Sequence, residues 1–406
     1  MTLKEYLLGQ RGWLEDFLTG LCAIPSVSGQ EAEAMRYLLD AFAGWDAELR
    51  EVPISDAIKC HPEYSSIVKN LDYAGRANLR LLKRGSGGRR LALNTHVDVV
   101  QPSAGQENPF APRVDAEGVL WARGACDAKG QIAAMALLVK AACEFAPLRH
   151  DIVCDIVIEE EFGGNGTVAL LDAEPDFTAD MLVNMEPTNL RVQTSIRGAL
   201  WFEMAFTGSP GHTGSAVRGV SALDKAIAAI DLMKAYHAKL LERSKDYGLF
   251  KGKPNPLPLT IGGLNAGEWP SMVPGSAVLK GLIGVLPNTT REAVMREIAG
   301  LFDRPESAWI GEGMSMEFVY RHNAVETDPN HPLVRALSRA SDACGLDGTP
   351  DAMTASSDAT YYFERGIPAV AFGPGSISTA HSRHEHVALS DILKAAEVLY
   401  TMLDHL

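Results

Sequence analysis

The segment Leu91-Ala-Leu-Asn-Thr-His-Val-Asp98 begins as an apolar run and ends in a histidine and an aspartate. Downstream, residues 132–145 place apolar side chains on one helical face, and a second apolar run covers residues 152–158. Short apolar runs are typical of buried strands, and helical periodicity between two of them indicates a strand–helix–strand unit. This order predicts an α/β domain with a mostly parallel sheet and helices on both faces.

The same patterns continue on both sides of this unit. Two more buried strands are predicted at 181–183 and 369–372. Helical spacing of apolar residues predicts helices over 4–21 and 31–42, with a break at Pro25-Ser-Val-Ser-Gly29 between them.

From about Arg197 the pattern is that of a different domain. Strands and helices are expected in the order βαββαβ, at residues 200–206, 222–241, 257–261, 277–285, 290–302 and 314–320. That order is typical of a ferredoxin-like α+β unit. Because the α/β pattern resumes after Asn323, we predict a discontinuous domain of residues 1–196 and 323–406 with an inserted domain of residues 197–322.

Composition excludes several classes of protein. The 406 residues are 46% apolar and 22% charged, which is ordinary for a globular chain and excludes a disordered or fibrous one. The 37 lysines and arginines stand against 51 acidic residues, for a net charge of −14. A negative surface repels phosphates and anionic lipids, so neither nucleic acid nor membrane is expected as a partner.

The cysteines and the N-terminal segment both bear on the cellular location of the protein. The six cysteines form no CxxC pair, so we expect reduced thiols rather than disulfides or a zinc–thiolate site. Residues 1–16 carry charges and lack an apolar secretory core, and no run of about 18 uncharged apolar residues exists. A cytoplasmic protein is predicted.

Residues that can bind metal follow the predicted strands. They are His96 and Asp98, Glu159-Glu-Glu161, Glu186 and His381, with Asp127 just before the buried helix. Ligand sites in open α/β sheets lie at the carboxyl ends of the strands, so these side chains are placed where a site is expected.

Imidazole and carboxylate together form the ligand set of zinc and similar divalent ions. Two histidines with three or more carboxylates can hold two ions that share one carboxylate and activate water. A further free glutamate can then accept the proton of that water, and the aspartate of a His-x-Asp pair can orient the imidazole. Each signal is common alone, so the prediction of a two-metal site rests on their combination.

The combined pattern resembles that of a known family over nearly the whole chain. The matching stretches are Asn94-Thr-His-Val-Asp98, Arg123-Gly-Ala-Cys-Asp127, Glu160-Glu-Phe-Gly-Gly164, Met185-Glu-Pro187, Gly208-Ser-Pro-Gly-His212, Ser357-Asp358, Gly373-Pro-Gly375 and Ala380-His381. The family is that of the dinuclear zinc amidohydrolases and metallopeptidases, which includes acetylornithine deacetylase, succinyl-diaminopimelate desuccinylase, aminoacylase and glutamate-releasing carboxypeptidases.

The resemblance implies a role for each residue of the site. Asp127 would bridge two divalent ions, zinc first with cobalt or manganese as alternatives, and the remaining ligands would be His96 and Glu186 at one ion and Glu161 and His381 at the other. Glu160 would be the general base and Asp98 the residue that orients His96. The triple glutamate leaves the register open by one residue, and Glu160 is chosen because Glu161-Phe-Gly163 fits the family pattern.

The resemblance also implies the role of the inserted domain, which would act as a lid and form a homodimer. His212 would stabilise the tetrahedral oxyanion, across the dimer interface in this family. Candidate substrate contacts are Arg197, Ser357, Gly373 and Gly375. His384, His386 and Cys126 are interpreted as ordinary loop and packing residues.

Two positions depart from the family pattern. Gly284 stands near the position where relatives often carry an arginine, and Ser271 stands where many carry asparagine. Recognition of a substrate carboxylate could instead fall to Lys280 or Arg197.

The resemblance implies hydrolysis of an amide bond in a small N-acyl amino acid, as in acetylornithine deacetylase or succinyl-diaminopimelate desuccinylase. A dipeptidase or carboxypeptidase with the same chemistry is the first alternative. A metal- or ligand-binding protein without catalysis and a two-metal phosphoesterase are more distant ones.

Overall fold

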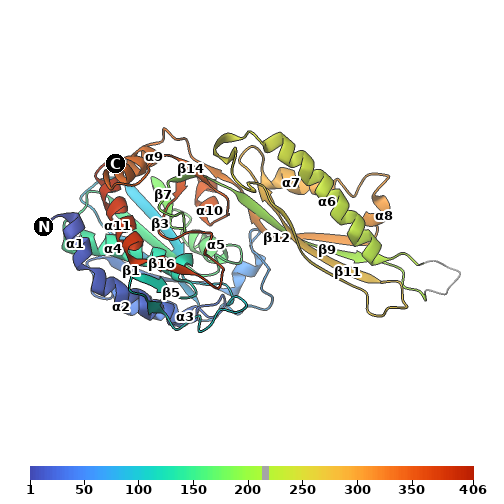
Figure 1. Ribbon diagram of the computed structural model, residues 1–406, viewed down its shortest axis with the longest axis horizontal. Helices are drawn as coiled ribbons and strands as arrows, with labels where there is room; N and C mark the ends of the chain where they lie inside the picture. The colour runs from blue at the N-terminus through green and yellow to red at the C-terminus, as the bar shows by residue number, and fades with distance from the viewer. Residues whose placement is uncertain (213–218) are drawn as a thin grey trace. The chain divides into compact units, whose positions relative to one another are not determined.

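The computed structural model describes residues 1–212 and 219–406, which form two compact units (Figure 1). The first unit comprises Met1–Ile196, Val325–Met353 and Ser357–Leu406. The second comprises Arg197–Ala324 and Thr354–Ser356. Each unit is described by itself.

A nine-stranded sheet forms the centre of the first unit, in the order β1-β2-β6-β3-β7-β15-β8-β13, with β14 paired to β8. The strands are β1 (Glu48–Pro53), β2 (Ala77–Lys83), β3 (Arg90–His96), β6 (Asp151–Val157), β7 (Met181–Asn184), β8 (Gln193–Ile196), β13 (Val325–Glu326), β14 (Asp351–Met353) and β15 (Ala369–Ala371). The four central strands, β6, β3, β7 and β15, are parallel to one another. Their carboxyl ends therefore lie at one edge of the sheet.

Helices cover the central strands, whose residues are almost all buried. The helices of this unit are α1 (Leu3–Gly9), α2 (Arg11–Cys22), α3 (Ala32–Phe42), α4 (Gly130–Glu144), α5 (Asn165–Asp172), α9 (Pro332–Ala343), α10 (Ala359–Glu364) and α11 (Leu389–Leu403), with short turns η1 (Asp56–Cys60) and η2 (Ala125–Lys129). α4 packs on β3 and β6, while α5 packs on β2 and β6. A small separate sheet joins β4 (Arg113–Val114), β5 (Val119–Trp121) and β16 (His386–Ala388).

These elements confirm the predicted α/β class. The apolar run that begins the segment 91–98 and the strands expected at 152–158, 181–183 and 369–372 correspond to β3, β6, β7 and β15. The helix expected at 132–145 corresponds to α4. The single helix expected over 4–21 is wrong, because the chain forms α1 and α2 with Gln10 between them. The apolar spacing continues through this bend, so periodicity alone does not reveal it.

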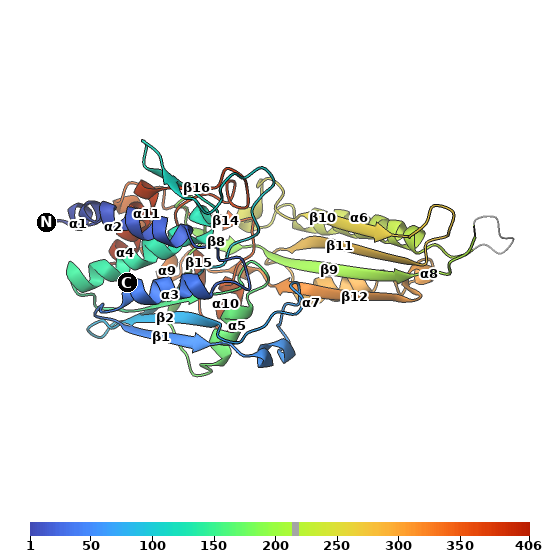
Figure 2. The ribbon, with the colours of Figure 1, turned by 90° about the horizontal axis from the view of Figure 1, so that it is seen from below.

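The second unit contains a four-stranded antiparallel sheet in the order β10-β11-β9-β12. Its elements are β9 (Gly198–Thr207), α6 (Ala222–Ser244), η3 (Gly248–Phe250), β10 (Leu259–Ala266), β11 (Ser276–Val285), α7 (Arg291–Ala299), α8 (Ala308–Gly311) and β12 (Met314–His322). Figures 1 and 2 show α6 and α7 on one face of this sheet. Phe202, Met204 and Phe206 of β9 are buried, and the residues between them are half-exposed, as expected for a sheet with one covered face. This is the expected ferredoxin-like α+β unit.

All six cysteines lie in the described residues and are free thiols. Among the helices that the structure describes, none combines the length and apolar character needed to cross a bilayer.

Candidate metal centre

The candidate ligands gather at the carboxyl edge of the large sheet. His96 is the last residue of β3, Glu186 follows β7 by two residues, and Glu161 lies in the turn after β6. Asp127 lies in η2, and His381 lies in the loop between β15 and β16. The fold thus brings together residues that are up to 285 positions apart because parallel neighbouring strands end side by side.

The first ligand group consists of His96, Asp127 and Glu186, whose ligand atoms lie within 4.8 Å of one another. His96 Nε2 lies 3.2 Å from Asp127 Oδ1, and all three residues are buried. Glu186 Oε1 is buried without a hydrogen-bond partner among the described residues. A buried carboxylate oxygen without a donor is costly, and a cation bound there would remove that cost.

The second ligand group consists of Asp127, Glu161 and His381. His381 Nε2 lies 3.3 Å from Asp127 Oδ2 and 2.9 Å from Glu161 Oε2. The two oxygens of Asp127 therefore face different histidines, one in each group. Two nitrogen donors and three carboxylates, one of which is the shared aspartate, fit a pair of divalent ions.

Asp98 links His96 to the turn that carries the glutamates. The Asp98 carboxylate lies 3.4 Å from His96 Nδ1, which also lies 3.0 Å from the Asp98 carbonyl oxygen. It accepts hydrogen bonds from the backbone N–H groups of Glu160 and Glu161 at 3.2 and 3.3 Å, and from Ser28 Oγ at 2.8 Å. Asp98 is therefore placed to fix the His96 ring and the turn together.

The three consecutive glutamates point to different surroundings. Glu159 has a left-handed backbone, with φ of 60°, and accepts hydrogen bonds from Tyr73 (2.7 Å) and Asn165 (2.9 Å) in the interior. Glu161 belongs to the second ligand group. Glu160 belongs to neither group, and its Oε2 lies 3.9 Å from His96 Nε2. This arrangement favours the predicted register, with Glu160 as the free carboxylate.

Burial and mutual repulsion dominate the electrostatics of the centre. Burial raises the pKa of Glu160 well above its ordinary value, and the carboxylates of Glu186 and Glu161 add to this rise against the effect of His96. Burial likewise raises the pKa of Glu186 and Glu161. Buried carboxylates that repel one another in this way are stabilised by bound cations, as expected for a metal centre.

At Asp127 and His381, by contrast, hydrogen bonds within the centre outweigh the effect of burial on the pKa. Burial acts to raise the pKa of Asp127, but hydrogen bonds with His381 and His96 outweigh it and hold that pKa below its usual value. Burial acts to lower the pKa of His381, but its bonds to Asp127 and Glu161 raise it to about 11.

The other predicted residues of the first unit lie around the ligands. Ser357 is buried, and its Oγ has no hydrogen-bond partner among the described residues. A methyl group added to Gly373 would lie 2.7 Å from the carbonyl oxygen of Glu186, and one added to Gly375 would lie 2.6 Å from Cys126 Sγ. The two glycines thus allow the loop after β15 to approach the ligand segments closely.

The remaining predicted residues belong to the second unit. His212 is exposed and forms an isolated bridge with Met272, the neighbour of Ser271. Lys280 forms an exposed ion pair with Glu203 at 2.8 Å. Arg197 is half-buried, and burial lowers the pKa of its guanidinium to about 10.

Sequence reasoning missed one residue that contacts the centre, Glu385, together with the role of its partner Arg123. Glu385, between His384 and His386, is buried and forms an ion pair with the buried Arg123. Its Oε1 accepts hydrogen bonds from the backbone N–H groups of Cys126 and Asp127, both at 3.1 Å. The only local signal is an acidic residue soon after His381, since its partners lie far away in the sequence.

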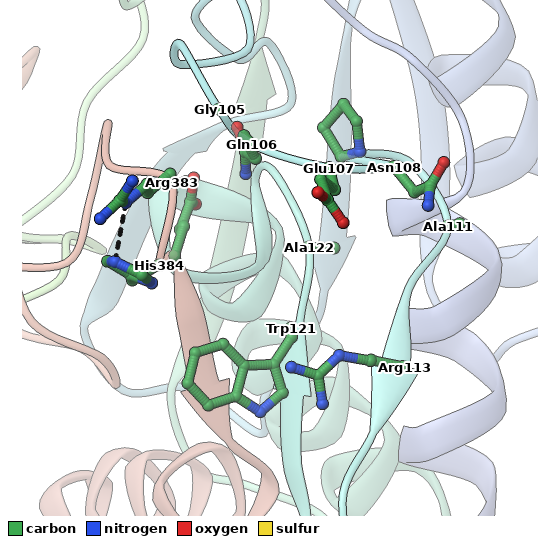
Figure 3. Close-up of a pocket in the computed structure, with 12 residues that line it drawn as sticks. Gly105, Gln106, Glu107, Asn108, Ala111, Arg113, Trp121, Ala122, Arg383 and His384 are labelled. Carbon is green, nitrogen blue, oxygen red and sulfur yellow. Dashed lines mark hydrogen bonds between the residues drawn. The ribbon is translucent and has the colours of Figure 1, made fainter.

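A cavity of about 470 Å³ lies beside this region, lined by residues 105–109, 111, 113, 121, 122 and 383–385. Figure 3 shows Arg383 and His384 on one side of it and Trp121 with Arg113 on the other. The Arg113 guanidinium lies 5.0 Å from the centre of the Trp121 ring. Glu385 lines this cavity, but the ligands of the two groups do not.

Comparison with known proteins gives consistent results. Residues 92–405 match the family model described as peptidase family M20/M25/M40. The chain is 28% identical to acetylornithine deacetylase from Myxococcus xanthus over 344 residues, which cover 83% of this chain and 86% of that protein. It is 26% identical over 342 residues to N-formyl-4-amino-5-aminomethyl-2-methylpyrimidine deformylase from Bacillus subtilis (strain 168), with 76% and 77% covered.

Solved structures share the fold. The dipeptidase Dug1p from Saccharomyces cerevisiae superimposes with a TM-score of 0.78 at 15% identity, covering 99% of this chain and 97% of that one.

Proposed function

The chain belongs to peptidase family M20/M25/M40 and is a hydrolase of that family, and on this premise we propose that it removes the acyl group from a small N-acyl amino acid. One observation carries the two-metal part of the proposal, namely that Asp127 is shared by two ligand groups beside a glutamate that belongs to neither. Zinc is the proposed metal, with cobalt or manganese as substitutes.

When bound, the two ions supply Lewis-acid polarisation of the scissile carbonyl and lower the pKa of water. His96 and Glu186 would hold one ion, Glu161 and His381 the other, and Asp127 both. Asp98 would orient the His96 ring through the contacts of its carboxylate and carbonyl oxygen with His96 Nδ1, which leaves Nε2 to face Asp127.

Glu160 would move the proton. Its carboxylate accepts a proton from the attacking water and returns it to the nitrogen of the leaving amine. Because Glu160 is only 8% exposed, a proton held there is shielded from exchange with bulk water between the two steps.

The substrate carboxylate is assigned to Arg197. A methyl group at Gly284 would lie 3.1 Å from Arg197 Cδ, so the absence of a side chain at 284 leaves room for this arginine. Arg197 Nε is buried without a hydrogen-bond partner among the described residues, whereas Lys280 already pairs with Glu203. The guanidinium of a half-buried arginine with such an unpaired nitrogen is suited to bind a carboxylate.

We assign three further roles by family resemblance. The second unit acts as a lid and dimerisation domain, His212 stabilises the oxyanion, and Ser357, Gly373 and Gly375 contact substrate. A cytoplasmic location stays a prediction.

The test is amine release from a panel of N-acetyl and N-succinyl amino acids and dipeptides, using protein stripped with a chelator and reloaded with zinc or cobalt. We expect metal-dependent cleavage of the N-acyl amino acids. Cleavage of dipeptides alone would replace the deacylase proposal by a dipeptidase, and two bound ions without any cleavage would reject both substrate classes.

The carboxylate contact is tested with the substrate found in the panel. Arg197→Met should raise KM about 10- to 100-fold, the range expected when a charge-assisted hydrogen bond is lost, with little change in kcat. Lys280→Met is the matched control and should leave KM unchanged. Equal effects of the two variants would contradict the assignment.

A further inference from the structure

A buried ion pair lies next to the second ligand group. Arg123 and Glu385 are 1% and 2% exposed, and they come from the segments that precede Asp127 and follow His381. Removing two charges from water is expensive, and well-packed apolar residues often stabilise a fold as well or better. Stability alone therefore gives a poor account of this pair.

Glu385 fixes the backbone at the shared ligand. Its Oε1 accepts the backbone N–H groups of Cys126 and Asp127 at 3.1 Å each. The carboxylate thereby joins the loop after His381 to η2, so that Asp127 is held from the backbone side.

Arg123 holds the loop between β15 and β16 at His381, through Ser103. Its Nη2 donates to Ser103 Oγ at 2.8 Å, and Ser103 Oγ donates to the carbonyl oxygen of His381 at 2.8 Å. His381 has a left-handed backbone, with φ of 56°, which a residue with a side chain adopts only when its surroundings hold it. Ser103 provides such a contact.

The first ligand group is supported differently. His96 ends a central strand and contacts Asp98, and Glu186 follows the adjacent strand. Within residues 1–212 and 219–406, the hydrogen bonds of Arg123, Glu385 and Ser103 reach the ligand residues Asp127 and His381 but neither His96 nor Glu186.

We propose that Arg123 and Glu385 are positioning residues that set the affinity of the second ligand group for its metal ion. They would affect the first group less, because their contacts reach two ligands of the second group, Asp127 and His381, but only the shared Asp127 of the first. The inference rests on the two-metal function proposed above. Two residues outside the ligand set would thus make the metal affinities of the two ligand groups unequal.

The test compares metal binding by the parent protein and by Glu385→Gln, using Co²⁺ added to the chelator-stripped chain. The visible spectrum and calorimetry report each binding step. Loss of a residue that orients a ligand lowers metal affinity about 10- to 100-fold. We expect a loss of that size in the weaker step and a smaller loss in the tighter one, which shares only Asp127 with it. Asp155→Asn is the matched control, because it also removes a buried carboxylate paired with an arginine, Arg80, and should alter neither step.

A double variant separates positioning from folding. Glu385→Leu with Arg123→Met removes both buried charges, so its thermal stability should recover relative to Glu385→Gln. The affinity of the second ion should stay low, because the N–H groups of Cys126 and Asp127 still lack their acceptor. Recovery of both stability and affinity would overturn the proposal.

Failure of the inference and failure of the proposed function give different results. If the parent binds two ions but cleaves nothing in the panel, the function is wrong and the binding comparison still decides the inference. If Glu385→Gln binds both ions as the parent does, or weakens both steps equally, the inference is wrong whatever the activity.

Discussion

The two ligand groups use the same kinds of side chain on different supports. In the first group, His96 ends one strand, Glu186 follows the adjacent parallel strand, and both residues are buried. In the second, Glu161 and His381 lie on loops, and the His381 side chain is 49% exposed. A sheet fixes the first group through its own hydrogen bonds, whereas the second depends on contacts between segments far apart in the sequence. Two groups with the same kinds of ligand therefore differ in how rigidly the fold holds those ligands.

The largest loss of metal affinity is expected from a change at Asp127, the ligand that both groups share. Asp127→Asn removes the carboxylate that both groups share, so neither ion should be held tightly. We expect metal affinity to fall by more than the roughly 100-fold seen for residues that only support a ligand. Metal content after dialysis is the measurement, and retention of two ions would show that the groups are independent.

Glu160→Gln should leave both groups intact and stop the chemistry. Glu160 belongs to neither group, so two ions should still bind. Loss of a general base lowers kcat by roughly 10²- to 10⁴-fold. Activity within a few-fold of the parent, measured with full metal content, would contradict the assigned role.

The order in which metal leaves sharpens the comparison. A chelator should remove the ion of the second group first, because His381 is exposed and His96 is buried. His381→Ala should therefore bind one ion with nearly the parent affinity for the first step. His96→Ala is the matched variant, and it should lose the tighter step instead.

The smallest effect is expected from Ser103→Ala. This variant removes one hydroxyl between Arg123 and the His381 carbonyl. A single hydrogen bond contributes about 1 kcal/mol, or about fivefold in affinity, and only the second step should change. Calorimetry with Zn²⁺ resolves a change of that size, and a change in the first step would contradict the division between the groups.

The first group could be predicted from the sequence because its ligands follow apolar runs. His96 ends one buried strand and Glu186 follows another, so periodicity and residue type together locate them. The ferredoxin-like unit could be predicted from similar patterns, since apolar and polar residues alternate clearly in β9 and the order of strands and helices is that of this fold. The helix over 4–21 was harder, because a bend at Gln10 leaves the apolar spacing unchanged.

The support of the second group could not be predicted from local pattern. Glu385 resembles a loop residue between two histidines, and only the fold places it against Arg123 and the N–H groups of η2. Glu159 likewise resembles its two neighbours until the fold places Tyr73 and Asn165 around it. Contacts between distant segments depend on the tertiary structure, which one sequence does not display.

The connection to the inserted unit has a consequence for how such a chain can be assembled. The first unit ends at Ile196 of β8 and resumes at Val325 of β13, and these two residues are direct partners in an antiparallel strand pair. A two-residue turn could join strands so placed. Seen from the first unit, the whole insertion therefore occupies the position of a hairpin loop, and its length adds little to the entropy of closing that loop. A gene could gain, lose or exchange this segment at one hairpin without disturbing the sheet that carries the metal ligands.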